Sequence, residues 1–199
     1  MIKHVLIAFC FVFLFSLGFV SAQDIGPTDQ IVVWTQAISN NPNDAIAYFK
    51  RGNAYYQQTQ YDSAISDYTK ATEINPNYAA AYVARGYIYD IKKAQYDLAF
   101  DDYNKAISID PHYFAPYLNR GCLYIKRGQY DLAIQDFDKA IELDPKSSSP
   151  YFWKGSALEK QQKYSDAIAL YKQLISTSQD KVAIDIAKSR IRMLGGVVE

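Results

Sequence analysis

Apolar and small side chains recur along this chain at the spacing of a helix face. Tyr48, Gly52 and Tyr55 are four and three positions apart, which places them on one side of a helix. A second stripe of the same spacing is centred on Tyr68, and only a short polar stretch separates the two stripes. The pattern therefore predicts two helices joined by a tight turn, with small residues where the helices approach closely.

This pair of stripes recurs with a period of 34 or 35 residues. One glycine marks the first helix of each unit, and an aromatic residue marks the second. The recurring columns are Gly52, Gly86, Gly121 and Gly155; Tyr48, Tyr82, Tyr117 and Tyr151; Ala64, Ala99, Ala133 and Ala167; Tyr68, Tyr103, Phe137 and Tyr171; and Pro76, Pro111 and Pro145. Self-similarity of this length indicates a stack of helical hairpins.

These columns resemble the tetratricopeptide repeat, and the resemblance covers residues 45 to about 177. It implies an all-α, right-handed superhelical solenoid of antiparallel helix pairs. There are two departures. The second unit carries one extra residue between Tyr89 and Tyr96, which predicts a longer turn, and the fourth unit has Leu158 and Leu174 where Tyr and Ala are usual. The fourth unit also lacks the closing proline.

The repeat register predicts the organisation of the whole chain, with about ten helices after removal of the leader. Apolar spacing before the first unit matches the second helix of an incomplete repeat, and an amphipathic helix at the end would cap the stack. The expected segments are a linker (23–27), a degenerate half repeat (28–42), four repeats (45–78, 79–113, 114–147 and 148–180) and a capping helix (181–194).

Residues 1–22 have the pattern of a secretory signal peptide. Lys3 is followed by an apolar run of sixteen residues from Val5 to Val20, and cleavage is expected after the small residue Ala22. The run is short for a membrane span, which needs about 20 residues. We therefore expect a periplasmic or secreted protein, with an uncleaved membrane anchor as the alternative.

Composition argues against catalysis and against nucleic-acid binding. The 21 basic residues balance the 21 acidic ones, so no charge excess indicates a nucleic acid or an anionic membrane as partner. Beyond the leader the only Cys and His are Cys122 and His112, too few for a zinc site and without a third catalytic group. We expect no enzyme activity, metal or cofactor. The acidic pairs Asp101–Asp102 and Asp136 with Asp138 are expected at helix starts or on solvated outer faces.

One to two steps around each first helix from the glycine stripe lies a second, largely apolar face. In the tetratricopeptide family the first helices line a concave groove that holds extended peptides or a partner's helix. The expected groove residues are Phe49, Lys50, Asn53, Tyr56, Val83, Tyr87, Leu118, Asn119, Cys122, Phe152, Trp153 and Ser156. Some of the apolar ones would instead pack between units, which is the alternative interpretation.

The sequence therefore predicts an exported adaptor or scaffold that binds an unidentified protein or peptide segment in this groove. Some family members grip a C-terminal carboxylate with a fixed set of Lys, Arg and Asn residues. That set is incomplete here in any register, so we do not expect this specificity. A self-assembling, homo-oligomeric envelope component is the alternative function.

Overall fold

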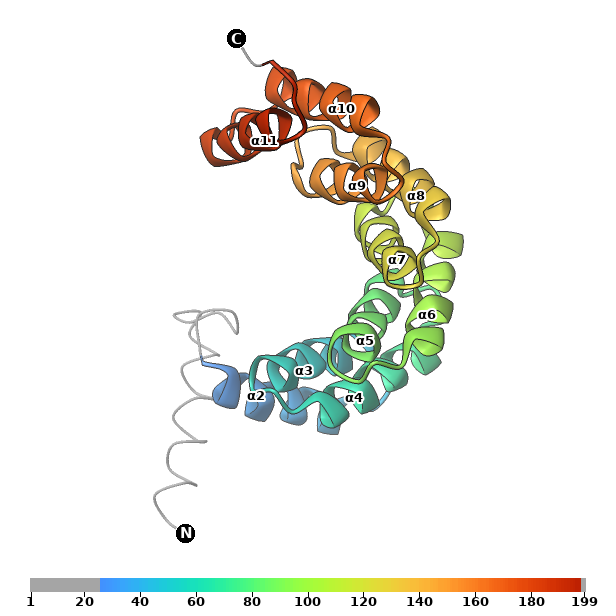
Figure 1. Ribbon diagram of the computed structural model, residues 1–199. Coiled ribbons are helices and arrows are strands. Elements are labelled where there is room, and N and C mark those ends of the chain that lie inside the picture. The colour runs from blue at the N-terminus through green and yellow to red at the C-terminus, as the bar shows by residue number, and fades with distance from the viewer. Residues whose placement is uncertain (1–25, 198–199) are drawn as a thin grey trace. The chain divides into compact units, whose positions relative to one another are not determined.

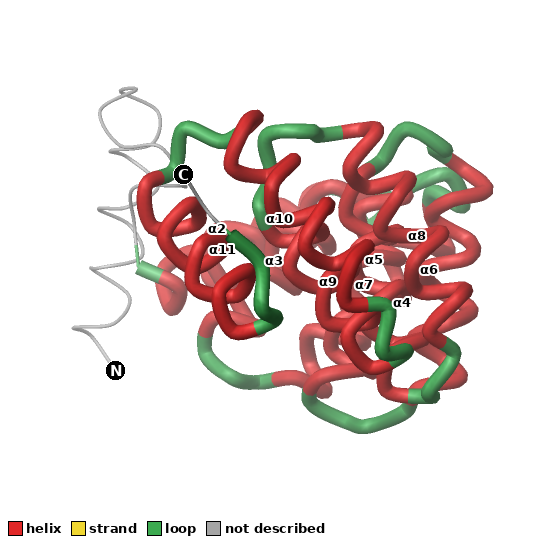
Figure 2. Tube along the Cα trace, turned by 45° about the horizontal axis from the view of Figure 1, so that its top comes forward, coloured by secondary structure: helices red, strands yellow, loops and turns green. Residues whose placement is uncertain are grey.

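The computed structural model describes residues 26–197, and the predicted leader at residues 1–22 lies outside that range. The described residues form ten helices and no strand (Figures 1 and 2). The helices are α2 (Pro27–Asn40), α3 (Ala45–Gln57), α4 (Tyr61–Ile74), α5 (Ala79–Ile91), α6 (Tyr96–Ile109), α7 (Phe114–Lys126), α8 (Tyr130–Leu143), α9 (Ser149–Lys160), α10 (Tyr164–Thr177) and α11 (Lys181–Met193). The expected all-α helical repeat solenoid is confirmed.

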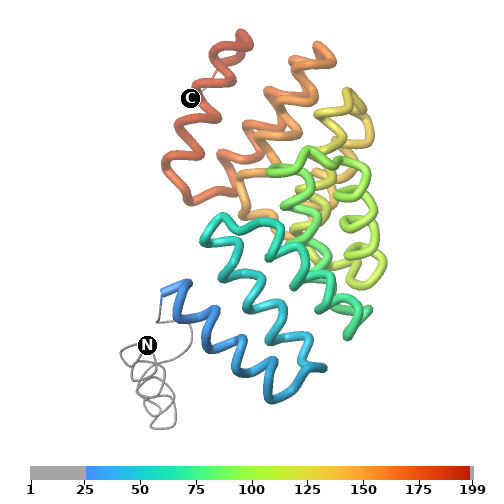
Figure 3. Tube along the Cα trace, turned by 90° about the horizontal axis from the view of Figure 1, so that it is seen from below, coloured from blue at the N-terminus to red at the C-terminus, as the bar shows by residue number. Residues whose placement is uncertain are grey.

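The helices fall into two compact units, divided after Asn77. In the first unit α2 packs on α3, and α3 packs on α4. In the second unit α5 pairs with α6, α7 with α8 and α9 with α10. Within this second unit α5, α7 and α9 lie along one side, and α6, α8 and α10 lie along the other (Figure 1). The final helix, α11, runs beside α10 (Figure 3).

The hairpin turns share one backbone feature that the sequence pattern does not reveal. In each turn, the residue two places before the second helix has a positive φ angle. These residues are Thr59, Ala94, Gly128 and Gln162. Only one of the four is a glycine, although left-handed backbone favours glycine. The extra residue of the second unit lengthens its turn without removing this left-handed position.

At each glycine of the column, an aromatic ring of the second helix lies directly against the first helix. A Cβ atom placed on Gly121 would lie 2.6 Å from Cε1 of Phe137, and one on Gly52 would lie 2.7 Å from Cε1 of Tyr68. Such distances are shorter than van der Waals contact. Glycine is therefore required here because the facing ring occupies the space of a side chain.

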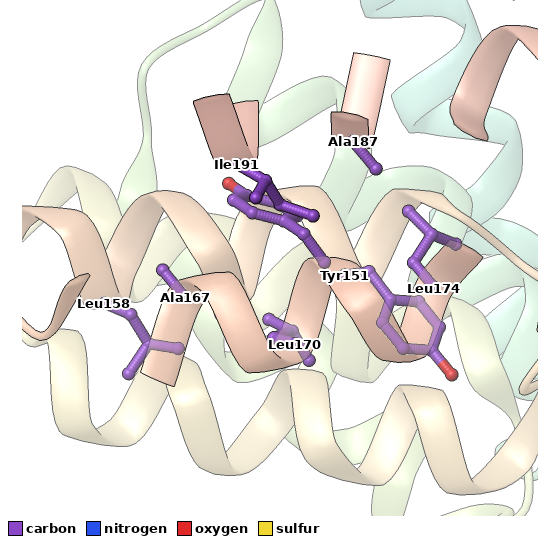
Figure 4. Close-up of a cluster of buried hydrophobic side chains, with 8 residues drawn as sticks. Tyr151, Leu158, Ala167, Leu170, Leu174, Ala187 and Ile191 are labelled. Atoms are coloured by element: carbon purple, nitrogen blue, oxygen red, sulfur yellow. The ribbon is translucent and has the colours of Figure 1, made fainter. Parts of the chain in front are cut away.

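The last hairpin and the final helix share one apolar core (Figure 4). The cluster consists of Tyr151, Leu158, Ala167, Leu170, Tyr171, Leu174, Ala187 and Ile191. Ala187 and Ile191 come from α11, and both are fully buried. The carboxylate of Asp180 starts this helix by accepting hydrogen bonds from the backbone N–H groups of Val182 and Ala183, at 2.9 and 3.3 Å. Helix α11 thus covers apolar surface that the hairpin α9–α10 would otherwise expose.

Candidate functional site

The predicted groove residues fall on helices of both units. Four of them lie on α3 in the first unit, and the other eight lie on α5, α7 and α9 in the second. We call the part in the second unit the first-helix face. It comprises Tyr87, Leu118, Asn119, Cys122, Phe152, Trp153 and Ser156, with Val83 set apart for the reason given below.

On α3, two of the predicted ligand-binding side chains are engaged by the second helix of their own hairpin. The ring of Phe49 lies 5.6 Å from the ring of Tyr68, centroid to centroid. The hydroxyl of Tyr68 donates a hydrogen bond of 2.7 Å to Oδ1 of Asn53. The amide oxygen of Asn53 is therefore engaged within the hairpin, because the aromatic column of the second helix reaches across the glycine to it. Lys50 and Tyr56, also on α3, are half-buried.

Two apolar members of the predicted groove on α5 and α9 are likewise used inside the fold. Val83 is buried, so the prediction that it lines an open groove is corrected. The ring of Phe152 lies 6.1 Å from the ring of Tyr171 and packs against the core of the last hairpin. Phe49 and Phe152 both lie one residue after the tyrosine of the glycine stripe. They still contact the second helix of their hairpin, because that helix carries a large tyrosine ring at the facing position.

The remaining aromatic residues of the first-helix face are accessible. Tyr87 on α5 is 37% exposed and Trp153 on α9 is 45% exposed. Asn119 on α7 is half-buried, and its side chain makes no hydrogen bond with other residues in the range 26–197. Two accessible rings and a free carboxamide are groups that bind a peptide, since the rings supply apolar area and the amide both donates and accepts.

Ion pairs connect α5 to α7 and α9 to α11, and sequence reasoning missed them. Lys126 at the end of α7 forms an ion pair with Asp90 of α5, which is buried. Arg190 of α11 forms an ion pair of 2.6 Å with Glu159 of α9. Asp90 and Glu159 both stand four residues after the glycine of their unit, and this shared position is the signal that could have identified them.

Cys122 lies beside the first of these ion pairs. Burial raises the pKa of its thiol to about 12; the negative charge of Asp90 adds to this effect and Lys126 opposes it. The thiol is therefore protonated at neutral pH, unlike a nucleophilic cysteine. His112 is exposed in the turn before α7, and the structure does not bring it to Cys122. No group of three or more His, Cys, Asp or Glu side chains that could hold a metal occurs in the described part of the chain.

The expectation that Asp102 and Asp136 lie on solvated faces is wrong. Both are buried and form two-bonded ion pairs within their hairpins, Asp102 with Arg85 and Asp136 with Arg120. Burial raises the pKa of both carboxyl groups, and the arginine hydrogen bonds oppose that effect. Asp67 pairs with Arg51 in the same way. Each aspartate directly precedes the aromatic residue that packs against the glycine. The pairs therefore hold the two helices of a hairpin together beside that contact, which is a structural role.

Models of one family match most of this chain. Tetratricopeptide-repeat models match residues 45–78, 79–113, 115–147 and 137–169. No curated protein matches the chain. Within residues 26–197, no helix has both the length and the apolar character needed to cross a membrane.

Several solved structures share the fold. MamA is 23% identical, with a TM-score of 0.68 over 74% of this chain and 85% of MamA. YrrB, described as a TPR protein with an unusual peptide-binding site, is 23% identical, with a TM-score of 0.65 over 80% of this chain and 84% of YrrB. TTC0263, a thermophilic TPR protein of Thermus thermophilus, is 17% identical, with a TM-score of 0.64 over 91% of this chain and 95% of that protein.

Proposed function

Because this chain belongs to the tetratricopeptide repeat family, we propose that it is an exported adaptor or scaffold that holds a peptide or protein segment on the first-helix face. The observation that carries the proposal is the exposure of two large aromatic side chains, Tyr87 and Trp153, on first helices of the second unit. The peptide-binding site named for the structurally similar YrrB agrees with this interpretation.

The two rings and Asn119 have complementary roles in the proposed complex. Aromatic side chains that become buried in an interface often contribute about 2 kcal/mol or more each. The Asn119 carboxamide pairs with a peptide bond of the ligand, which fixes the direction of the bound segment more than it adds affinity. Tyr87 lies on α5, Asn119 on α7 and Trp153 on α9, so one extended segment would contact three repeats.

The test compares Trp153→Ala with a control matched for exposure. Leu132 is 41% exposed but belongs to α8, on the other side of the unit from the first helices. Partners captured from the exported fraction are identified, and their affinity for each variant is measured beside thermal stability. Trp153→Ala should weaken binding by tenfold or more, that is by about 1.4 kcal/mol, with folding kept. If Leu132→Ala weakens binding and Trp153→Ala does not, the partner binds elsewhere.

A second candidate function, homo-oligomeric assembly, is favoured by a surface on α11. Val182, Ile186 and Met193 are 67%, 46% and 72% exposed, and their spacing places them on one side of that helix. An exposed apolar stripe of this kind suits an interface between copies. Light scattering of the wild type and of Ile186→Lys tests this candidate. A wild-type dimer that Ile186→Lys dissociates supports assembly, and a monomeric wild type contradicts it.

A further inference from the structure

The charged side chains of the first helices are almost all neutralised inside the fold. Helices α5, α7 and α9 carry seven charged residues, and six have a partner of opposite charge. The pairs are Arg85–Asp102, Asp90–Lys126, Arg120–Asp136, Lys154–Asp138 and Glu159–Arg190. The exception is Lys160, the last residue of α9, which has no charged partner among residues 26–197.

The pairs that join α5 to α7 and α9 to α11 matter most for a ligand. Asp90 is buried, and its ion pair with Lys126 joins α5 to α7. Glu159 accepts hydrogen bonds from both Arg190 and the hydroxyl of Tyr171, at 2.6 and 2.9 Å. A basic ligand group could bind either carboxylate only by displacing its partner, and an acidic group would meet a cation whose charge is already balanced. Leaving such a charge unpaired is costly, so these pairs do not serve as charged subsites.

The neutral polar group of the face lies on the same side of α7 as the first of these pairs, about two helical turns away. Asn119 and Lys126 are seven residues apart, so they share one side of α7. Lys126 reaches Asp90 on α5, and the side of α7 that carries Asn119 therefore faces α5. Tyr87 stands three residues before Asp90 on that helix. The region between α5 and α7 thus offers an aromatic ring and a carboxamide to a ligand, and the charges of Asp90 and Lys126 there neutralise each other.

Resting on the proposed function, we propose that the segment bound on the first-helix face is an extended, uncharged peptide with aromatic or aliphatic side chains. Its side chains contact Tyr87 and Trp153, and its backbone pairs with Asn119. Among the charged residues of α5, α7 and α9 only Lys160, at the end of α9, has no counter-ion in the described chain, so a basic peptide finds no complementary charge and an acidic one finds a single ammonium at one end. Binding should therefore depend little on ionic strength, because screening acts on attraction between free charges.

The test selects ligands without assuming their identity. A phage-displayed library of random peptides is selected against the purified protein, and enriched sequences are synthesised. We expect sequences with aromatic and aliphatic residues and no Asp, Glu, Lys or Arg in the enriched core. The Kd of such a peptide should change by less than about twofold between about 0.05 M and about 0.5 M NaCl. Enrichment of acidic or basic peptides, with a Kd that rises about tenfold over that range, would overturn the inference.

Three variants separate this inference from the proposed function. Trp153→Ala should raise the Kd of the selected peptides about tenfold or more. Leu132→Ala and Lys160→Ala should keep that Kd within about twofold of the wild-type value. If charged peptides are selected and Trp153→Ala weakens their binding, the first-helix face binds peptides and only the proposed ligand class is wrong. If no peptide is selected, or if Trp153→Ala leaves the Kd unchanged, the proposed function fails and this inference fails with it.

Discussion

The guanidinium of Arg120 binds the carboxylate of Asp136 through two hydrogen bonds, 2.8 Å from Nε and 2.7 Å from a terminal nitrogen. This pair joins α7 to α8 next to the close contact between Gly121 and Phe137, and both side chains are largely buried. In the fourth repeat the equivalent residues are Lys154 and Leu170, so the arginine and the aspartate are replaced together.

Removing one partner of this pair should destabilise the fold more than replacing both. Asp136→Leu leaves Arg120 buried without a counter-ion, and breaking a buried pair costs about 3 kcal/mol or more. The double variant Arg120→Met with Asp136→Leu removes both charges and should recover part of that loss. Urea unfolding of both variants measures the difference. Equal stability of the single and double variants would show that the two positions are not coupled.

Adding a side chain at Gly121 should destabilise the hairpin α7–α8. The new Cβ of Gly121→Ala would lie 2.6 Å from Phe137, and Gly121→Leu would add further atoms there. Overpacking of this kind costs about 1–3 kcal/mol, and Leu should cost more than Ala. Thermal unfolding measures the effect. Phe137→Leu, combined with Gly121→Ala, should restore part of the stability because the smaller side chain makes room, and a lack of any rescue would place the strain elsewhere.

The hydroxyl of Tyr103 is buried without a hydrogen-bond partner in the described protein, whereas the equivalent Tyr68 hydroxyl donates to Asn53. Tyr103→Phe should therefore be neutral or stabilise the protein by about 1 kcal/mol, since it removes an unsatisfied polar group. The matched change Tyr68→Phe breaks a hydrogen bond and should cost about 1 kcal/mol. Chemical denaturation of the two variants gives the comparison, and a larger loss for Tyr103→Phe than for Tyr68→Phe contradicts it.

The thiol of Cys122 should react slowly with thiol reagents in the folded protein. Burial raises its pKa to about 12, so little thiolate exists near neutral pH. Reaction with a thiol reagent at about pH 8 should be at least about tenfold slower in the native protein than in urea. As the pH rises above about 9, the unfolded thiol ionises while the folded one stays protonated, so the wild type should lose stability relative to Cys122→Ala. Equal labelling rates would show that the thiol is open to solvent.

Export is a proposal that rests on Lys3, the apolar run after it and Ala22. Protein recovered from the exported fraction should begin at Gln23, because a signal peptide is removed after a small residue. Intact-mass measurement gives the answer directly. A full-length chain in the membrane fraction would instead support the uncleaved anchor, and a full-length chain in the cytoplasm would exclude both.

The sequence alone determined the helical hairpin, its period and the close contact at each glycine. Those features follow from spacing within one helix and from recurrence along the chain, and both are visible in the order of residues. The close contact at Gly121 could be predicted from the sequence, because a glycine that recurs at the same position of a helical stripe indicates a crowded contact. The family resemblance rests on the same columns.

Only the tertiary structure decided which side chains of the first helices are engaged inside the fold. Periodicity places Asn53 one residue after the glycine of its helix and Asn119 two residues before the glycine of its own. It does not show that Tyr68 binds Asn53, or that Asn119 has no hydrogen-bond partner in the described chain. It likewise gives no sign that Lys126 would reach Asp90, which is 36 residues away. Helical spacing fixes the face on which a residue lies. What stands opposite that face depends on how separate helices pack, and packing joins residues that are distant in the sequence.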